Sequence, residues 1–181
     1  AINASLVLSY VAMRKDDKAG LVPFNEHFDT FVPASKQVGQ MQTLLENLYK
    51  QETTFGETDF SALCVHLGKH VNKRSFLMLY TNFSNMTSLN RQLVYLQQLA
   101  RQHRVLVVFF EDADLKEYIA GKPETTEGYY QHVIAEKFAF EKRLIVSTLK
   151  QHGIDSLLTT PDKLSIDVIN KYLEMKSRQL L

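Results

Sequence analysis

The run VLVVFF at residues 105–110 decides the fold class, because it is an unbroken apolar stretch with polar residues on either side. A strand that is apolar on both faces is typical of a parallel sheet covered by helices. FLMLYT at 76–81 is a second such run, and IDSLLTT at 154–160 is a third predicted strand. Helical spacing between these strands favours an open, mostly parallel α/β sheet with right-handed crossovers.

The remaining segments extend the same pattern. Apolar residues at helical spacing predict helices over 2–13, 37–51, 60–71, 88–103, much of 129–151, and 165–176. GLVPF at 20–24 and FDTFVP at 28–33 are rich in β formers and bounded by turn residues, so they predict a hairpin. We expect this hairpin to supply an antiparallel edge to the parallel sheet, with helices on both faces.

Length and charge limit the classes of protein. The 181 residues fit one domain, and we expect a single domain over 1–181. A formal net charge of +1 argues against nucleic acid or an anionic membrane as a partner. The single cysteine, Cys64, lies in an apolar helical run, where a buried thiol is expected. No apolar run reaches the roughly 18 residues of a spanning helix, so we expect a soluble chain.

Three polar loops fall where ligands bind in such a sheet, at the carboxyl ends of the strands. They are FGETD at 55–59, TNFSN at 81–85 and EDAD at 111–114. Their oxygen side chains could hold a magnesium ion, although ordinary loops with helix caps are the plainer interpretation. Phenylalanines in two of the loops would either anchor a partner or fold into the core. The predicted partner-binding rim consists of Phe55, Glu57, Phe83, Asn85, Asp112 and Asp114.

Two further patterns bear on enzymatic chemistry. Asp112 and Asp114 resemble the two-aspartate motif of phosphate-transferring hydrolases, so a small metal-dependent phosphohydrolase is the alternative function. Leu115 follows them, and the strand comes late in the chain, which disfavours this alternative. His66 and His70 share a helix face and could both reach zinc, but the sequence between them lacks the glutamate of a metalloprotease helix. A surface or partly packed pair is the better interpretation.

Four segments in order carry a family resemblance: RKDDKAGLVPF at 14–24, FGETDFSAL at 55–63, FLMLYTNF at 76–83 and SIDVINKYLEMKSRQLL at 165–181. Together they resemble the bacterial domain of unknown function family fifty-eight, whose members look like von Willebrand factor A domains. The resemblance covers essentially the whole chain. It implies no enzymatic activity, a MoxR-type AAA+ ATPase as partner, and a position at the cytoplasmic face with membrane anchoring through preceding helices. We therefore expect a protein-interaction module that assists assembly.

The resemblance also implies a metal-ion-dependent adhesion site. By motif, its threonine matches Thr58 and its aspartate falls on Asn82, which keeps an oxygen ligand but lacks the charge. Its Asp-x-Ser-x-Ser segment and the first central strand are expected upstream of Ala1, which makes the chain an N-terminally truncated domain. We therefore expect a degenerate or incomplete site with no cofactor or weak magnesium or calcium binding. The missing strand would leave an open edge between Leu21–Phe24 and Phe76–Tyr80, where a homodimer could form.

Overall fold

The computed structural model describes residues 1–24, 30–51, 58–83, 85–111, 115, 118–119, 121 and 125–180. The chain divides into two compact units. Unit 1 consists of Ala1–Lys73 with Leu164–Leu181, and unit 2 of Arg74–Lys163. The single domain expected from the sequence stays a prediction, and each unit is described by itself below.

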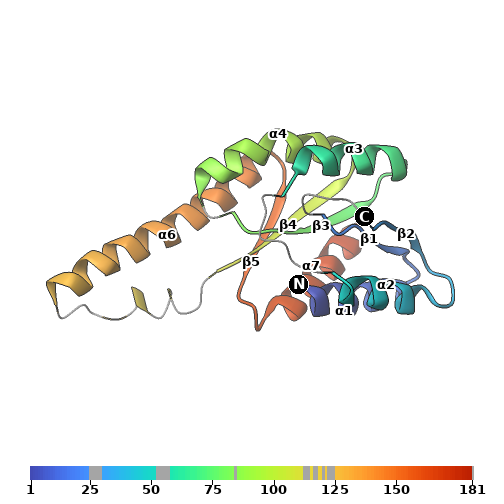
Figure 1. Cartoon of the computed structure of the whole chain (residues 1–181), viewed down its shortest axis with the longest axis horizontal. Helices are drawn as coiled ribbons and strands as arrows, with labels where there is room; N and C mark the ends of the chain where they lie inside the picture. The colour runs from blue at the N-terminus through green and yellow to red at the C-terminus, as the bar shows by residue number, and fades with distance from the viewer. Residues whose placement is uncertain are drawn as a thin grey trace. The chain divides into compact units, whose positions relative to one another are not determined.

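Unit 2 contains a three-stranded parallel sheet in the order β3, β4, β5 (Figure 1). Its strands are β3 (Phe76–Tyr80), β4 (Arg104–Phe110) and β5 (Asp155–Thr159). The register places Leu79 opposite Val107 and Val108 opposite Leu157. The central strand is buried from Val105 to Phe109, because both of its faces are apolar. The sequence prediction of a parallel α/β sheet is therefore confirmed.

Two helices of unit 2 pack on this sheet. α4 (Met86–Gln102) packs against β4, and α6 (Thr126–Gln151) packs against β5 and α4. α4 begins with a capping box, in which the Asn85 side chain accepts from the Ser88 amide at 2.9 Å and Ser88 Oγ accepts from the Asn85 amide at 3.4 Å. Figure 1 shows the first half of α6 extending beyond the strands.

Polar side chains at the amino end of β4 contact residues at the amino ends of the two neighbouring strands. His103 is buried, and its Nδ1 accepts a hydrogen bond from the Ser75 amide at 3.3 Å. Burial lowers the pKa of His103, which keeps the ring neutral and leaves Nδ1 able to accept. Arg104 of β4 forms an ion pair at 2.5 Å with Asp155 of the neighbouring strand β5. These contacts fix the register of the sheet at its amino end.

Unit 1 combines four helices with a two-stranded sheet among its described residues. The helices are α1 (Ile2–Arg14), α2 (Gln40–Tyr49), α3 (Phe60–His70) and α7 (Leu164–Ser177). β1 (Ala19–Leu21) pairs antiparallel with β2 (Val32–Ser35), which confirms the predicted hairpin. None of the described helices of the chain is long and apolar enough to cross a membrane.

The place of the hairpin in the fold differs from the prediction. We expected it to form an edge of the parallel sheet, but the described strands form two separate sheets. β1 has only three residues, and Pro23 beyond it has no amide donor with which to continue a ladder. The residues described therefore give a three-stranded parallel sheet plus an antiparallel hairpin, and not one continuous sheet.

The core of unit 1 joins the hairpin to its helices. Leu6 of α1 and Leu44 of α2 belong to one buried cluster with Ala19 and Val32 of the two strands. The Gln40 side chain at the start of α2 donates to the carbonyl of Ala19 at 2.8 Å and, on β2, to the carbonyl of Pro33 at 2.9 Å. This amide therefore ties α2 to both strands at once.

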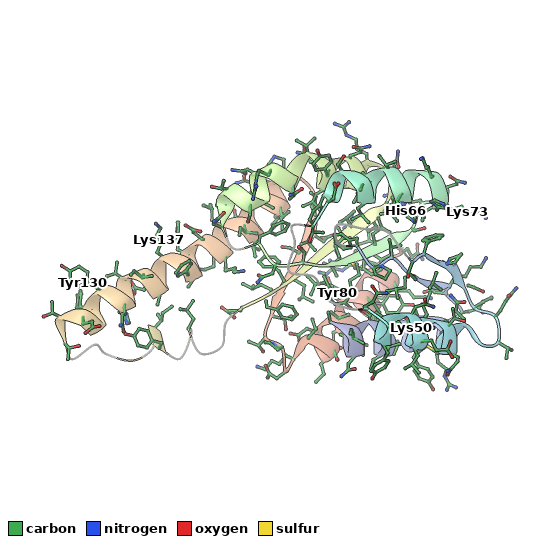
Figure 2. All side chains as sticks on the ribbon, in the orientation of Figure 1. Lys50, His66, Lys73, Tyr80, Tyr130 and Lys137 are labelled. Atoms are coloured by element: carbon green, nitrogen blue, oxygen red, sulfur yellow. The ribbon has the colours of Figure 1, made fainter. Side chains whose placement is uncertain are left out.

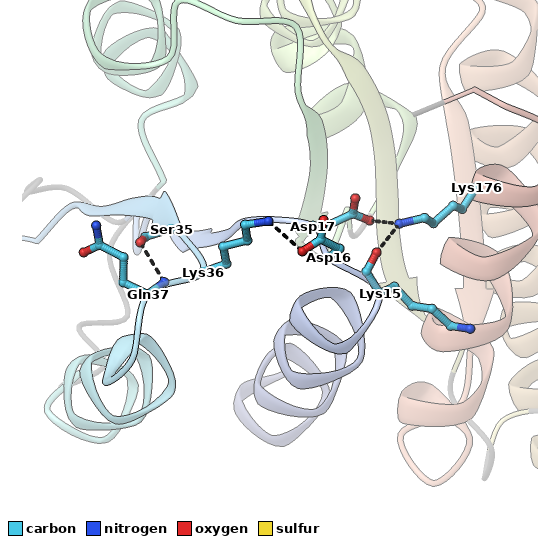
Figure 3. Close-up of polar contacts among 7 residues, drawn as sticks. All are labelled: Lys15, Asp16, Asp17, Ser35, Lys36, Gln37 and Lys176. Atoms are coloured by element: carbon cyan, nitrogen blue, oxygen red, sulfur yellow. Dashed lines mark hydrogen bonds and ion pairs between the residues drawn. The ribbon is translucent and has the colours of Figure 1, made fainter.

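A polar contact joins the two ends of unit 1. Asp17, just after α1, accepts hydrogen bonds from the Tyr172 hydroxyl and from Lys176 Nζ, the latter at 2.6 Å. Lys176 also donates to the Lys15 carbonyl at 2.9 Å, as Figure 3 shows. Tyr172 is only 3% exposed, so its hydroxyl depends on this partner. α7 is thus held at the carboxyl end of α1, against which it packs.

Candidate functional site

The carboxyl edge of the parallel sheet in unit 2 is the candidate site, because ligands of open α/β sheets bind there. Sheet-like pairing continues one residue beyond the strands. The Thr81 amide donates to the Val108 carbonyl, and the Glu111 amide donates to the Thr159 carbonyl, both at 3.0 Å. The segments that follow β3 and β4 therefore leave the sheet at this same edge.

Lys142 of α6 reaches this edge. Its Nζ donates to Asn82 Oδ1 at 2.7 Å and to the Phe83 carbonyl at 2.8 Å. It also lies 5.7 Å from the centroid of the Phe109 ring, a distance at which cation and ring attract each other. Burial lowers the pKa of Lys142. The candidate site therefore contains a partly desolvated ammonium group held by two neutral oxygens.

This arrangement bears on the predicted metal ligands. Asn82 does lie at the carboxyl edge, but its oxygen already accepts from the Lys142 ammonium. A divalent cation on the same oxygen would meet that positive charge within a few ångströms, so the described residues here do not fit a metal ion. Elsewhere in the described parts of the chain, no group of three or more His, Cys, Asp and Glu side chains could hold one.

Thr58, the other predicted metal ligand, belongs to unit 1, so its pairing with Asn82 in unit 2 stays a prediction. It is half-buried and lies two residues before α3. The cap of that helix is Asp59, whose carboxylate accepts from the Ala62 amide at 2.9 Å.

The structure describes two residues of the predicted partner-binding rim. Phe83 is 3% exposed, so of the two alternatives for its ring, partner anchor or core, the structure shows the core. It follows β3 closely, and its side chain is buried while its carbonyl faces Lys142. Asn85 is exposed and caps α4. The other predicted residues lie outside the described residues, as does the aspartate pair of the alternative phosphohydrolase: Phe55, Glu57, Asp112 and Asp114.

The two histidines of α3 belong to an aromatic cluster in unit 1. The rings of His66 and His70 stack with centroids 4.3 Å apart, and the Phe31 ring lies 5.2 Å and 5.1 Å from them. Burial and the nearby positive charges of His70 and Lys69 lower the pKa of His66. This geometry confirms the partly packed pair. Cys64 on the same helix is buried, as expected.

Sequence reasoning missed Lys142. It lies 60 residues from Asn82 along the chain, so no local motif contains both. The sequence does contain one signal for Lys142. It is seven residues after Ala135 and seven before Leu149, so helical periodicity places it on the same face of α6 as these buried residues. A lysine at such a position indicates a cation with an internal partner, because unpaired charges are rarely buried.

A family model described as "Protein of unknown function DUF58" matches residues 1–121, which is more than half of the chain. The chain therefore belongs to this family, as the resemblance had indicated. The match begins in unit 1 and continues through β3, α4 and β4 of unit 2. No curated protein and no solved structure matches the chain.

Proposed function

We propose that this chain is a non-enzymatic protein-interaction module that assists assembly with a MoxR-type AAA+ ATPase. The observation that supports the proposal is Lys142 at the carboxyl edge of the sheet. A fixed ammonium on Asn82 and Phe83 supplies positive charge at the place where an adhesion-type site would use a metal ion. The proposed site is therefore a degenerate adhesion site that works without a bound metal.

The chemistry of Lys142 favours an acidic group on the partner. An ammonium has three N–H donors, and the two hydrogen bonds to Asn82 and Phe83 use two of them. Both of these acceptors are neutral, and burial has removed part of the water that would otherwise stabilise the charge. A carboxylate from the partner would compensate that loss, because an opposite charge within hydrogen-bond distance favours the charged form.

The binding experiment compares two lysines of the same helix. The protein is titrated with the MoxR-type AAA+ ATPase, as wild type, as Lys142→Met and as Lys150→Met. Lys150 is exposed in the last turn of α6 and serves as the matched control. We expect Lys142→Met to weaken binding at least tenfold, equivalent to about 1.4 kcal/mol, and Lys150→Met to leave it unchanged. Equal affinities for all three proteins, with folding verified by circular dichroism, would contradict the proposed site.

Metal binding is measured separately, on the chain alone. Calorimetric titration with magnesium or calcium should show at most weak binding, because Asn82 lacks a charge and its oxygen is already engaged. Thr58→Ala should then change nothing. Micromolar binding that is lost in Thr58→Ala would mean that a working metal site exists, and that Lys142 moves aside to admit the ion.

A further inference from the structure

α6 exposes more apolar surface than a solvated helix normally does. Seven large apolar side chains of this helix are 40–71% exposed: Tyr129, Tyr130, Val133, Ile134, Phe138, Phe140 and Leu144. The buried residues of the helix are Ala135, Ile145 and Leu149. A helix that is apolar around most of its circumference is normally covered on more than one side. We therefore expect another protein surface to cover the exposed apolar side of α6.

Part of this surface has the spacing of a coiled coil. Tyr130, Val133, Lys137, Phe140 and Leu144 follow one another at intervals of three, four, three and four residues, and we call this set the α6 seam. Such alternation is the heptad pattern of helices that pair lengthwise. At 100° per residue the centre of the seam lies about 140° around the helix axis from the centre of the buried residues of α6. Tyr130 and Lys137 are labelled on the outer half of the helix in Figure 2.

We propose that the α6 seam pairs with the α6 seam of a second copy of this chain, antiparallel and about a two-fold axis. In this arrangement Val133 lies opposite Leu144 of the second copy, and Lys137 lies opposite Phe140 of the second copy. A two-fold axis requires a surface that complements itself, and the seam meets that condition because each contact occurs twice. A parallel pair would instead place the two Lys137 ammonium groups against each other in the centre of the seam.

The charges beside the seam also favour the antiparallel pair. Glu136 and Arg143 flank the seam on one side, and both are exposed. Antiparallel pairing brings Glu136 near Arg143 of the second copy, and symmetry repeats this contact. Parallel pairing would bring Glu136 near Glu141 of the second copy, which are like charges. These charges therefore complement α6 of a second copy that runs in the opposite direction.

The available area agrees with a weak dimer. An aromatic side chain contributes about 150–250 Å² on burial, so Tyr130 and Phe140 of the seam and Tyr129, which flanks it on the side of Glu136, supply on the order of 400 Å² at 58–71% exposure. Val133, Ile134 and Leu144 add to this and bring the total nearer to the roughly 800 Å² per partner of a standard interface. We therefore expect an equilibrium between monomer and dimer in the micromolar range.

The first experiment is sedimentation velocity of the 181-residue chain over a concentration series. Wild type should show the monomer–dimer equilibrium, and Phe140→Glu should raise its dissociation constant at least tenfold. The matched control is Phe138→Glu, since Phe138 is 51% exposed on the same helix but lies off the seam. It should leave the dissociation constant unchanged. Circular dichroism verifies that both variants are folded.

The second experiment tests the antiparallel orientation by exchanging charges. Glu136→Arg and Arg143→Glu should each weaken the dimer, and the double variant should restore it, because the pair is reformed with reversed signs. A double variant weaker than either single variant would overturn the orientation. A wild type that stays monomeric, whether or not it binds lipid vesicles or another protein through α6, would overturn the proposal. So would equal effects of the two phenylalanine substitutions. None of these measurements involves the ATPase, so their failure leaves the proposed function untouched.

Discussion

The hydrogen bond between Tyr172 and Asp17 makes a quantitative prediction about unit 1. Tyr172→Phe removes a hydroxyl that donates to a carboxylate, an interaction that contributes about 1.5–3 kcal/mol. Asp17 is 40% exposed and keeps its bond to Lys176, so water and the ammonium replace part of the loss. We expect Tyr172→Phe to lower the free energy of unfolding by about 1 kcal/mol.

Asp17→Ala should cost more than Tyr172→Phe. It leaves the hydroxyl of a residue that is 3% exposed without its acceptor, which costs about 1–3 kcal/mol. It also removes the ion pair with Lys176, which is partly exposed and contributes little. The expected loss is about 2 kcal/mol. Adding Tyr172→Phe to Asp17→Ala should recover part of it, because the buried hydroxyl is then gone.

The pH dependence supplies a further test of the same contact. Burial, followed by the hydrogen bond and the charge of Asp17, raises the pKa of Tyr172 above its ordinary value. The native state then holds the phenol proton more tightly than the unfolded chain does. This stabilisation is complete below pH about 10 and is lost as the pH rises above that value. The difference in stability between wild type and Tyr172→Phe should therefore shrink in strong alkali.

The measurement is urea unfolding followed by circular dichroism, at neutral pH and above pH about 10, with hydrogen exchange of the α7 amides as the local probe. If Tyr172→Phe costs less than a few tenths of a kcal/mol at neutral pH, the hydroxyl does not contribute as argued. If the difference from wild type grows with pH, the direction of the pKa shift is wrong.

Three further predictions concern packing. Phe83→Ala should destabilise the chain by about 3–5 kcal/mol in urea unfolding, because the side chain is buried; a negligible change would mean that the ring is exposed after all. Gly20→Ala should cost at least about 1–3 kcal/mol in the same assay, since its Cβ would lie 2.7 Å from the Ala34 amide nitrogen and the Val32 carbonyl oxygen, and unchanged stability would refute that close approach. Burial raises the pKa of Cys64 to about 11, so a thiol reagent near neutral pH should label native protein far more slowly than protein in urea, and equal rates would show an accessible thiol.

Much of the fold could be predicted because single segments specify it. The apolar run at 105–110 corresponds to β4, which is buried on both faces, and the helical spacings correspond to observed helices. The bounds and register of the hairpin strands were harder to predict. Its second strand is Val32–Ser35, whereas the sequence indicated 28–33. Its register depends on the close approach at Gly20 and on the hydrogen bonds of Gln40, which are contacts between separate segments that local propensity does not report.

The candidate site could be predicted only in part. Asn82 lies at the expected edge, because a polar residue directly after a parallel strand must leave the sheet there. Phe83 in the same loop could equally have faced solvent or core, and packing decides that. Lys142 depends on how α6 is rotated about its axis, which the packing of Ile145 and Leu149 fixes. The division into two units leaves no trace in composition, since no linker rich in glycine, proline or serine separates them.

The discontinuity of unit 1 bears on how the chain folds as it is synthesised. Unit 2 is one uninterrupted segment, so all of its strands have been made by the time residue 163 leaves the ribosome. The first segment of unit 1 precedes unit 2 in the chain, yet unit 1 lacks α7 until residues 164–177 have been made, and α1 has no contact with that helix before then. The usual order, in which the N-terminal part completes its fold before the rest, is therefore reversed. Chains truncated after residue 163 and released from the ribosome should contain a structured unit 2 and an unfinished unit 1.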